Sequence, residues 1–223
     1  MEFDRVLVIA PHPDDEILGV GGFLKKLINS GSETLVLTVS GHLPPLYKIE
    51  DFNITLKEAK RAHKIIGVSN SEYWKIPATK IGDMPISEFN GKFDKVIKDF
   101  MPTVVLCPYP DRHIDHRLVF EAVMVATRPV GAGNNIKLLA AYETLSETHW
   151  NAPHIESNFV PNWIVDITHT IEDKKKALEC FESQITPFPG PRSIQAVDAL
   201  AKFRGTQAGF AYGEGLQIIR MIS

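Results

Sequence analysis

The sequence predicts an α/β fold, in which a mostly parallel sheet carries helices on both faces, and three observations lead to this prediction. Apolar strand-like segments and segments with helical periodicity alternate through the first 127 residues, which is the pattern of consecutive β-α-β units. Several strand-like segments are continuous apolar runs, such as RVLVIA and TVVLC, and such runs are typical of buried strands. The chain has 223 residues, 44% hydrophobic and 23% charged, which fits an ordinary globular domain.

The first elements follow directly from this periodicity. RVLVIA at 5–10 is expected to be the first strand. Residues 16–30 then place apolar side chains near one face of a helix, until the turn residues SGSE end it. ETLVLTVS at 33–40 predicts the second strand. A helix is expected at 55–66, where the glycine that follows ends it, and a short strand is expected at 72–76.

The alternation continues to the end of the chain. A helix is expected at 87–100, where Pro102 stops it, and TVVLC at 103–107 predicts the fourth strand. The later pattern predicts helices at 117–127, 171–184 and 193–203, and strands at 138–143 and 163–167. We find no internal repeat, so we predict one Rossmann-like domain over residues 1–223. In such a domain the ligand site lies outside the carboxyl ends of the strands.

Charge and composition exclude several classes of function. The net charge of −3 and a pI near 6.2 predict no binding to nucleic acid. No segment reaches the roughly 18 uninterrupted apolar residues of a membrane span, and the N-terminus does not resemble a signal peptide. The two cysteines, Cys107 and Cys180, have no metal-type spacing, and a disulfide framework is not expected. We therefore expect a cytoplasmic protein.

The segment GVGG at 19–22 follows the first strand and suggests a dinucleotide-binding turn. The G-x-G-x-x-G pattern fails, however, because Leu24 stands where the third glycine is needed. A phosphate there would also lie against three consecutive carboxylates, which repel it. We expect instead that these glycines let the first helix pack closely against the sheet.

Two polar segments lie at the carboxyl ends of predicted strands. PHPDDE at 11–16 follows the first strand, and DRHIDHR at 111–117 follows the fourth. These two strand ends are plausible neighbours in a doubly wound sheet. One Asp and two His residues would make a three-ligand metal site with an open position for water, which suits catalytic zinc and also Fe(II). The alternative is that Asp14 and Asp15 merely cap a helix, which leaves the histidines unexplained.

These two segments resemble the metal motifs of the LmbE-like, or PIG-L, family of zinc-dependent N-deacetylases. The resemblance extends along essentially the whole chain, through YETLSE, FVPNW.VDIT, K..AL.CFESQ, PRS and FRG. It implies that His12, Asp15 and His116 bind Zn²⁺, with Fe²⁺ possible. It also implies that Asp14 is the general base and that His113 stabilises the oxyanion, as a histidinium would, and passes a proton to the leaving amine.

Two further residues have supporting roles under the same resemblance. Asp115, between the two histidines, is expected to orient a metal ligand, and Glu16 is expected to cap the helix or to contact a ligand from behind. The remaining histidines are expected not to bind metal, including His63, His149, His154 and His169. Cys107 is expected to be an inert buried thiol rather than a nucleophile paired with a histidine.

The sequence departs from the family pattern at positions that concern the substrate. The family often has an arginine that contacts the sugar where this chain has Thr55, and the C-terminal AEAF reads YGEGL. Sugar contacts must therefore come from other residues, for which we name Arg112, Arg117, Arg192 and residues of the 42–54 loop, His42 among them. The loop at 42–53 is long and has the form of a substrate lid.

The predicted function is hydrolysis of the N-acetyl group of an amino sugar, free or conjugated, by zinc-activated water. One alternative is a non-catalytic module that binds a nucleotide or sugar. Another is a non-haem Fe(II) enzyme, although that chemistry usually occurs on a double-stranded β-helix, which the β-α-β pattern contradicts. Family resemblance and exposed apolar C-terminal segments also predict a homo-oligomer, possibly a hexamer, without nucleic-acid partners.

Overall fold

A seven-stranded sheet forms the centre of the computed structural model, which describes residues 3–222. The strands are β1 (Arg5–Ala10), β2 (Glu33–Gly41), β3 (Asn70–Pro77), β4 (Val104–Pro108), β5 (Leu138–Tyr142), β6 (Trp163–Asp166) and β7 (Gly213–Met221). Their order across the sheet is β3-β2-β1-β4-β5-β7-β6. The first five strands pair in parallel, whereas β7 runs antiparallel to both β5 and β6. The predicted mostly parallel sheet is confirmed.

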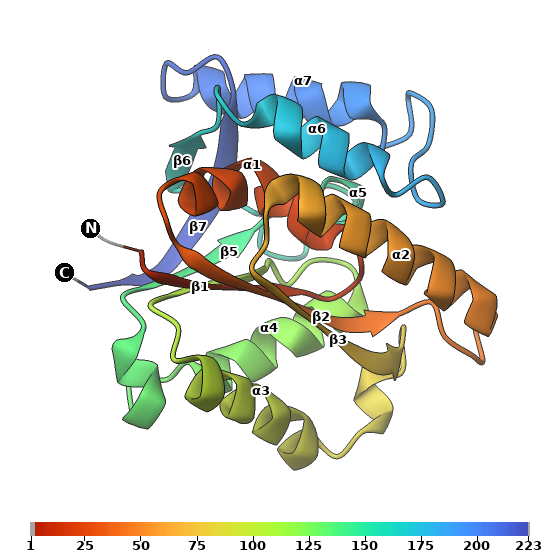
Figure 1. Cartoon of the computed structure of the whole chain (residues 1–223), viewed down its shortest axis with the longest axis vertical. Helices are drawn as coiled ribbons and strands as arrows, with labels where there is room; N and C mark the ends of the chain where they lie inside the picture. Colours follow the sequence, from red (N-terminus) through yellow and green to blue (C-terminus); the bar gives the residue numbers. More distant parts are fainter. Residues whose placement is uncertain (1–2, 223) are drawn as a thin grey trace.

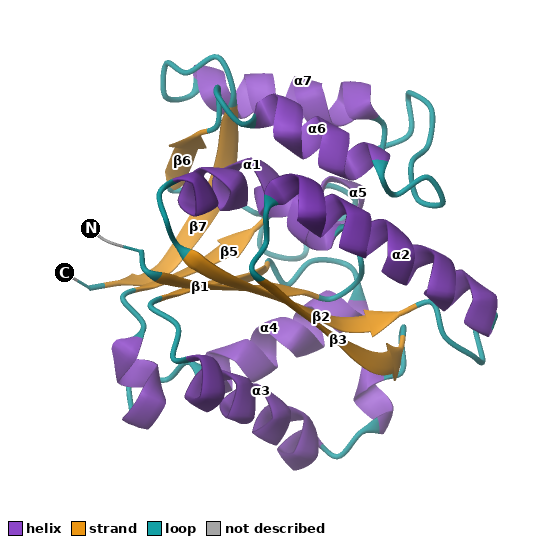
Figure 2. Ribbon diagram, in the orientation of Figure 1, coloured by secondary structure: helices purple, strands orange, loops and turns teal. Residues whose placement is uncertain are grey.

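Helices cover both faces of this sheet, as predicted. They are α1 (Asp15–Asn29), α2 (Ile49–Ile66), α3 (Ile86–Phe100), α4 (Ile114–Ala126), α5 (Leu145–Thr148), α6 (Ile171–Glu179) and α7 (Ile194–Thr206), with short 3₁₀ turns at Ile81–Asp83 and Gly131–Asn135. Helices α1, α2, α6 and α7 lie on one side and α3 and α4 on the other (Figure 1). Figure 2 shows the strands running between these two helical layers.

The hydrophobic core has two halves, one on each face of the sheet. Successive residues of a strand point to opposite faces, so Val6 and Val8 of β1 pack into one cluster and Leu7 and Ile9 into the other. All four of these side chains are fully buried. This burial on both faces explains why the central strands are continuous apolar runs in the sequence.

Close packing of α1 against the sheet requires two of its glycines. A β-carbon at Gly19 would lie 2.1 Å from the ring of Tyr142, and one at Gly22 would lie 2.9 Å from Ile167. The Tyr142 hydroxyl in turn donates a hydrogen bond to the backbone carbonyl of Ile9, at 2.8 Å. The expected role of the GVGG segment in packing is therefore confirmed.

A buried ion pair supports a bend in the middle of α1. Val20 leaves the helical conformation at φ −135°, ψ 18°. The Glu214 carboxylate accepts hydrogen bonds from two backbone N–H groups in the following turn, at 2.9 and 2.7 Å. Lys174 lies 2.6 Å from Glu214 and donates to the carbonyl of Leu18 at 2.8 Å. The pair thus satisfies backbone groups that the bend leaves without helical partners.

Several elements differ from those expected, among them β7, α2 and α6. Strand β7 was not predicted, because its start, GEG, has low strand propensity; a β-carbon at Gly215 would lie 3.0–3.2 Å from Glu143 and Arg204. Helix α2 begins at Ile49 and not at residue 55. At this earlier start, the backbone N–H of Lys48 donates a hydrogen bond to the Asp51 carboxylate at 3.0 Å. The loop expected at 42–53 is therefore limited to residues 42–48, and α6 ends at Glu179 instead of 184.

Across residues 3–222, none of the helices combines the length and the apolar character that crossing a membrane requires.

Candidate metal centre

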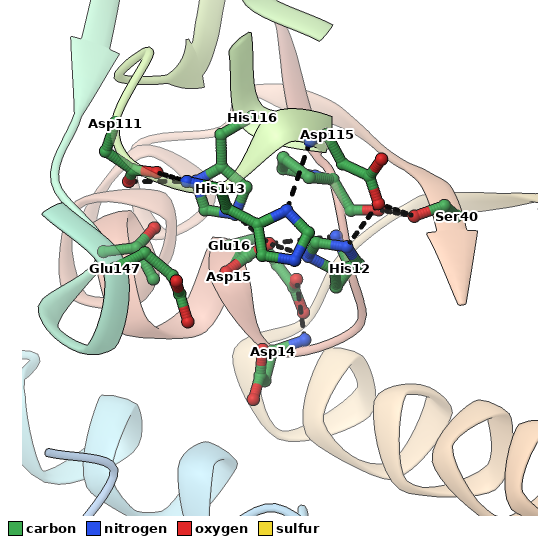
Figure 3. A network of polar contacts seen from close by, with 12 residues as sticks. His12, Asp14, Asp15, Glu16, Ser40, Asp111, His113, Asp115, His116 and Glu147 are labelled. Carbon is green, nitrogen blue, oxygen red and sulfur yellow. Dashed lines mark hydrogen bonds and ion pairs between the residues drawn. The ribbon is translucent and has the colours of Figure 1, made fainter. Parts of the chain in front are cut away.

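The two polar segments meet at one edge of the sheet. Strands β1 and β4 pair in parallel, with Val6 beside Val104 and Val8 beside Leu106, so their carboxyl ends lie side by side. The turn after β1 leads into α1, and the turn after β4 leads into α4. Figure 3 shows the side chains of both turns converging. The expected adjacency of the two motifs is therefore confirmed.

One carboxylate oxygen lies between two histidine nitrogens at the centre of this cluster. Asp15 Oδ2 is 3.2 Å from His12 Nδ1 and 3.2 Å from His116 Nε2. Nitrogen and oxygen ligands that bind zinc tetrahedrally at about 2.0–2.1 Å lie about 3.3 Å from one another. Asp15 Oδ1 and His116 Nε2 are buried and find no hydrogen-bond partner in the described part of the chain. These three side chains therefore fit a metal ion.

Two further carboxylates hold the outer nitrogens of these histidines. His12 Nε2 lies 3.0 Å from Asp115 Oδ2, and His116 Nδ1 lies 3.0 Å from Asp111 Oδ2. Asp115 also accepts the backbone N–H of Thr79 at 2.8 Å. Carboxylates that bond the second nitrogen of a metal-binding histidine fix its tautomer and orientation. Asp115 lies where we expected an orienting residue. We did not predict this role for Asp111, although an acidic residue just after a strand could have indicated it.

A looser grouping combines the three histidines. Ring nitrogens of His12, His113 and His116 lie within 4.8 Å of one another. His113 Nδ1, however, accepts the backbone N–H of Asp115 at 3.2 Å, as the N-cap of α4. In the group of His12, Asp15 and His116, the ligand atoms lie closer together, and none of these residues caps a helix through its side chain. We therefore favour this group as the metal site.

The electrostatics of the cluster favour bound positive charge. Burial opposes the charge on His12, but its hydrogen bonds with Asp115 and Asp15 prevail and raise its pKa to about 9. Burial also opposes the charge on His116, yet Asp15 and Asp111 raise its pKa to about 10. Despite burial, the neighbouring histidines hold the pKa of Asp15 well below its usual range. A divalent cation can supply the same positive charge in place of protons.

Asp14 directs its side chain into the cavity rather than onto the helix. Its backbone lies at φ 109°, ψ −25°, and its carbonyl accepts the N–H groups of Ile17 and Leu18 at 3.0 and 2.9 Å. Neither carboxylate oxygen has a hydrogen-bond partner among the described residues. Asp15 likewise bonds His12 and does not cap. Asp14 is the N-cap residue of α1 by position, but neither Asp14 nor Asp15 caps the helix through its side chain, so capping does not account for these acids.

One cation lies close to the Asp14 carboxylate. Arg192 Nε is 3.4 Å from Asp14 Oδ2. Burial raises the pKa of Asp14 to about 7, against the opposing charge of Arg192. A carboxyl with a pKa near neutrality can both accept and return a proton at physiological pH.

Glu16 and His63 form a second layer behind Asp14. Glu16 Oε2 accepts the backbone N–H of Asp14 at 3.3 Å, and Glu16 Oε1 lies 3.0 Å from His63 Nε2. His63 Nδ1 is held by Ser71 at 2.7 Å. Glu16 thus fixes the backbone of Asp14, and His63 contacts no candidate metal ligand.

His113 differs from expectation in its protonation. Burial and the positive charges of His12 and His116 lower its pKa to about 4. Because Nδ1 accepts a backbone N–H, the neutral ring carries its proton on Nε2. His113 is therefore suited to donate a hydrogen bond as a neutral imidazole, and the expected histidinium is disfavoured.

A cavity of about 200 Å³ opens above the cluster. Its lining includes His42, Arg112 and Arg192, which we named for substrate contacts, whereas the fourth named residue, Arg117, is not part of it. Tyr47, from the loop that was expected to cover the substrate, also lines it, and so do Glu147 and Gln184, which the sequence analysis missed. A second cavity of about 360 Å³ shares four of these residues and extends along α2 past Thr55.

A larger cavity, of about 610 Å³, lies elsewhere. It is bounded by Phe23, Trp163 and Phe210 with the end of α1. No residue of the metal cluster lines it, so volume alone does not identify the chemical site. Cys107 is remote from solvent, and burial raises the pKa of its thiol, which agrees with the expected inert thiol.

The fold and the site together define an α/β protein with a candidate metal centre at the carboxyl ends of its parallel strands. Residues 7–127, more than half of the chain, match the model of the family described as PIG-L: GlcNAc-PI de-N-acetylase. The chain belongs to this family. The resemblance that the two metal motifs indicated is therefore confirmed.

Two similar proteins are deacetylases. The diacetylchitobiose deacetylase of Thermococcus kodakarensis is 32% identical over 238 residues, covering 96% of this chain and 83% of that protein. The structure of the N,N'-diacetylchitobiose deacetylase from Pyrococcus horikoshii, in complex with an inhibitor, superposes with a TM-score of 0.76 at 26% identity, over 98% of this chain and 84% of that one.

A third similar structure has a different activity. The 4-carboxy-2-hydroxymuconate hydratase of Pseudomonas putida shares the fold with a TM-score of 0.77 at 20% identity, over 99% of this chain and 98% of that chain. The fold alone therefore does not determine the reaction, which must be argued from the site.

Proposed function

We propose that this protein is a metal-dependent N-deacetylase that hydrolyses the acetamide of an N-acetylated amino sugar or of its conjugate. The observation that carries this proposal is the placement of Asp15 Oδ2, 3.2 Å from one nitrogen of each of two buried histidines, beneath a cavity that is also lined by Asp14, whose carboxylate makes no hydrogen bond within residues 3–222. The similarity to two diacetylchitobiose deacetylases supports the reaction type.

His12, Asp15 and His116 would hold the metal ion, which we propose to be Zn²⁺, with Fe²⁺ as the alternative that the same ligands accept. Asp115 and Asp111 hold the outer nitrogens of the two histidines at 3.0 Å and would keep both rings in the ligating orientation. When bound, the metal would lower the pKa of a coordinated water to about 7 and polarise the acetamide carbonyl.

Asp14 would act as the general base and then as the general acid. It would accept a proton as the water oxygen bonds to the acetyl carbon, and return that proton to the nitrogen as the C–N bond breaks. Acetate and a free amine are the products. Its oxygens make no hydrogen bond within residues 3–222, and its pKa is raised to about 7, which suits both transfers.

His113 would stabilise the oxyanion that forms at the acetyl carbon. Its Nδ1 is fixed by the backbone N–H of Asp115, so the opposite ring nitrogen can donate a hydrogen bond to that oxygen. A pKa lowered to about 4 favours this neutral donor over a proton-delivering histidinium. We therefore assign the proton transfer to the leaving amine to Asp14.

The cavity lining suits a polar, uncharged ligand such as a sugar. His42, Arg112 and Arg192 line it together with Tyr47, Glu147 and Gln184, and these side chains provide both donors and acceptors. The adjoining second cavity would accept whatever is joined to the amino sugar, which is where a conjugate would extend.

The test is metal analysis with an acetate-release assay on N-acetylglucosamine and N,N'-diacetylchitobiose, with and without chelator. We expect about one metal ion per chain and chelator-sensitive acetate release. His116→Ala should lose the metal, whereas His154→Ala, at an exposed position, should keep metal and activity. Tight sugar binding without acetate from the zinc-loaded protein would favour the non-catalytic alternative. Oxygen-dependent turnover would favour the Fe(II) enzyme.

We also propose that the protein forms a homo-oligomer, possibly a hexamer. Ile219, Met221 and Ile222 at the end of β7 are 41–47% exposed, which is apolar surface that a second copy can cover. Light scattering on the purified protein measures this directly, and a monomeric mass at micromolar concentration contradicts it.

A further inference from the structure

Glu147 is a buried carboxylate in the catalytic cavity that has a charged neighbour but leaves one oxygen without a hydrogen bond among the described residues. It lies on α5, is 8% exposed and lines the cavity above the metal cluster. Its Oε2 atom is buried and finds no hydrogen bond within residues 3–222. The nearest cation is Arg112, whose Nε lies 3.2 Å from Oε2 but is not aligned to donate. A buried acceptor left in this state is costly unless a ligand satisfies it.

Neighbouring residues already provide the contacts that hold α5 in place. The Thr148 hydroxyl donates to Asp111 Oδ2 at 2.9 Å, which ties α5 to the carboxylate behind His116. Thr148 Oγ1 also accepts the N–H of Thr144 at 2.8 Å. The fold therefore does not need the Glu147 carboxylate, which remains available to a ligand in the cavity.

Charge limits the kind of ligand group that Glu147 can accept. A carboxylate or phosphate would be repelled by Glu147 and by Asp14 in the same cavity. A cation would meet the guanidinium groups of Arg112 and Arg192, which also line it. An acceptor next to a donor matches a neutral hydroxyl, which donates to one group and accepts from the other.

We propose that Glu147, together with Arg112, is the specificity-determining contact of this enzyme, and that it accepts a hydrogen bond from a ring hydroxyl of the substrate pyranose. This inference rests on the proposed deacetylase function. It makes the cavity selective for a polyhydroxylated ring over a simple N-alkyl acetamide. A substrate that lacks the hydroxyl leaves the buried carboxylate unpaired, and sites of this kind discriminate strongly against such analogues.

The test combines a protein change with a substrate change. We would compare the wild type with Glu147→Gln, and with Glu156→Gln as a control at an exposed glutamate outside the cavity lining. For each, kcat/KM for acetate release is measured on N-acetylglucosamine methyl glycoside and on its 3-, 4- and 6-deoxy analogues. Melting temperature and metal content serve as the controls for folding.

We expect one deoxy analogue to be about 10–100-fold poorer than the parent glycoside for the wild type and for Glu156→Gln, as for loss of a hydrogen bond to a charged group. For Glu147→Gln this ratio should fall to within about threefold, with metal content and melting temperature unchanged. A Glu147→Gln variant that keeps the full ratio for every analogue overturns the inference, and so does a uniform loss across all four substrates.

Binding of the same glycosides by calorimetry separates this inference from the proposed function. If the wild type binds the parent glycoside but releases no acetate, the proposed function fails, and the deoxy-analogue comparison is made on Kd instead. If the wild type turns over and Glu147→Gln shows unchanged discrimination, the deacetylase function stands and the role of Glu147 is wrong.

Discussion

Three consecutive acidic residues at the start of α1 contact three different parts of the site. The Asp15 carboxylate lies between two histidines, Glu16 bonds His63, and the Asp14 carboxylate lines the cavity, where Arg192 is its charged neighbour. Successive side chains at the start of a helix point about 100° apart, so one short segment can supply a ligand, a support and a base. This is why the chain can place such a high density of negative charge at a strand end.

Replacement of Asp14 tests the base without removing the ligands. We expect Asp14→Asn to keep its metal and to lose about 10²–10⁴-fold in kcat, because the amide cannot accept the proton. Metal analysis and acetate release measure the two effects separately. Asp94→Asn, on the surface of α3, is the control for an Asp-to-Asn change away from the site and should keep both metal and activity. A turnover close to that of the wild type would remove Asp14 from the mechanism.

Alkylation tests whether the cysteine on β4 has a chemical role. Cys107 is fully buried, and burial raises the pKa of its thiol. Since only the thiolate reacts, native protein at pH 8 should incorporate iodoacetamide at Cys180, which is partly exposed, well before Cys107. Mass spectrometry of peptides locates the label. Rapid native labelling of Cys107, together with loss of activity, would revive the Cys-His alternative.

At the scale of elements, the bend in α1 depends on residues far along the chain. Glu214 is on β7 and Lys174 on α6, and both are buried. Removing one member should leave the other as an unpaired buried charge, so Lys174→Met and Glu214→Gln should each cost about 3–5 kcal/mol of unfolding free energy. Urea denaturation of both single variants measures this.

The double variant provides the internal control for this pair. Because neither charge then remains alone, Lys174→Met with Glu214→Gln should be destabilised by clearly less than the sum of the two single changes. Strictly additive losses would indicate that the two residues act independently, and the pairing at the bend would then be irrelevant to stability.

The elements that were predicted well are those whose signal is local. Strands β1 and β4 are apolar runs, and α1 and α3 have a clear helical period. The local sequence is therefore enough to predict these four elements. β7 begins with Gly213 and Gly215, which are needed only because Ile164, Glu143 and Arg204 lie close by in space. The beginning of α2 at Ile49 depends on a bond between Lys48 and Asp51, which periodicity does not reveal.

The same distinction holds within the site. His12, Asp15 and His116 lie in two compact motifs, and strand adjacency brings the motifs together, so a sequence can indicate the metal cluster. Glu147 and Gln184 reach the cavity from a short helix and a loop whose positions depend on tertiary packing. Their contribution could not be inferred from spacing.

At the scale of the whole molecule, an ion cluster around the buried carboxylate of Glu143, the residue that follows β5, joins this segment to α7. The Arg204 guanidinium donates to both oxygens of Glu143, at 2.8 and 2.7 Å, and His149 Nε2 lies 2.8 Å from the same carboxylate. Burial raises the pKa of Glu143, but the hydrogen bonds from His149 and Arg204 and the charge of Arg204 outweigh it and lower the pKa below its ordinary value.

This cluster predicts a specific loss of stability in acid. Because the folded-state pKa of Glu143 is depressed, its contribution is fully present above the ordinary carboxyl pKa of about 4.3 and is lost as the pH falls through the lower folded value. Urea unfolding at several pH values between 7 and 3 should give a flatter profile for Glu143→Gln than for the wild type. Glu88→Gln, at an exposed position, should follow the wild-type profile, and parallel profiles for all three proteins would contradict the assignment.

At Asp14, the left-handed backbone means that the residue needed for catalysis lowers thermal stability. A residue with a β-carbon at φ 109° costs roughly 1–3 kcal/mol that glycine would not. A search for heat-resistant variants that ignores activity should therefore recover Asp14→Gly, with a higher melting temperature and no acetate release. Homologues that have lost the reaction but kept the fold would be free to make this exchange. Glycine at this position in a newly sequenced relative would thus indicate a protein that has kept the fold and lost the deacetylase activity.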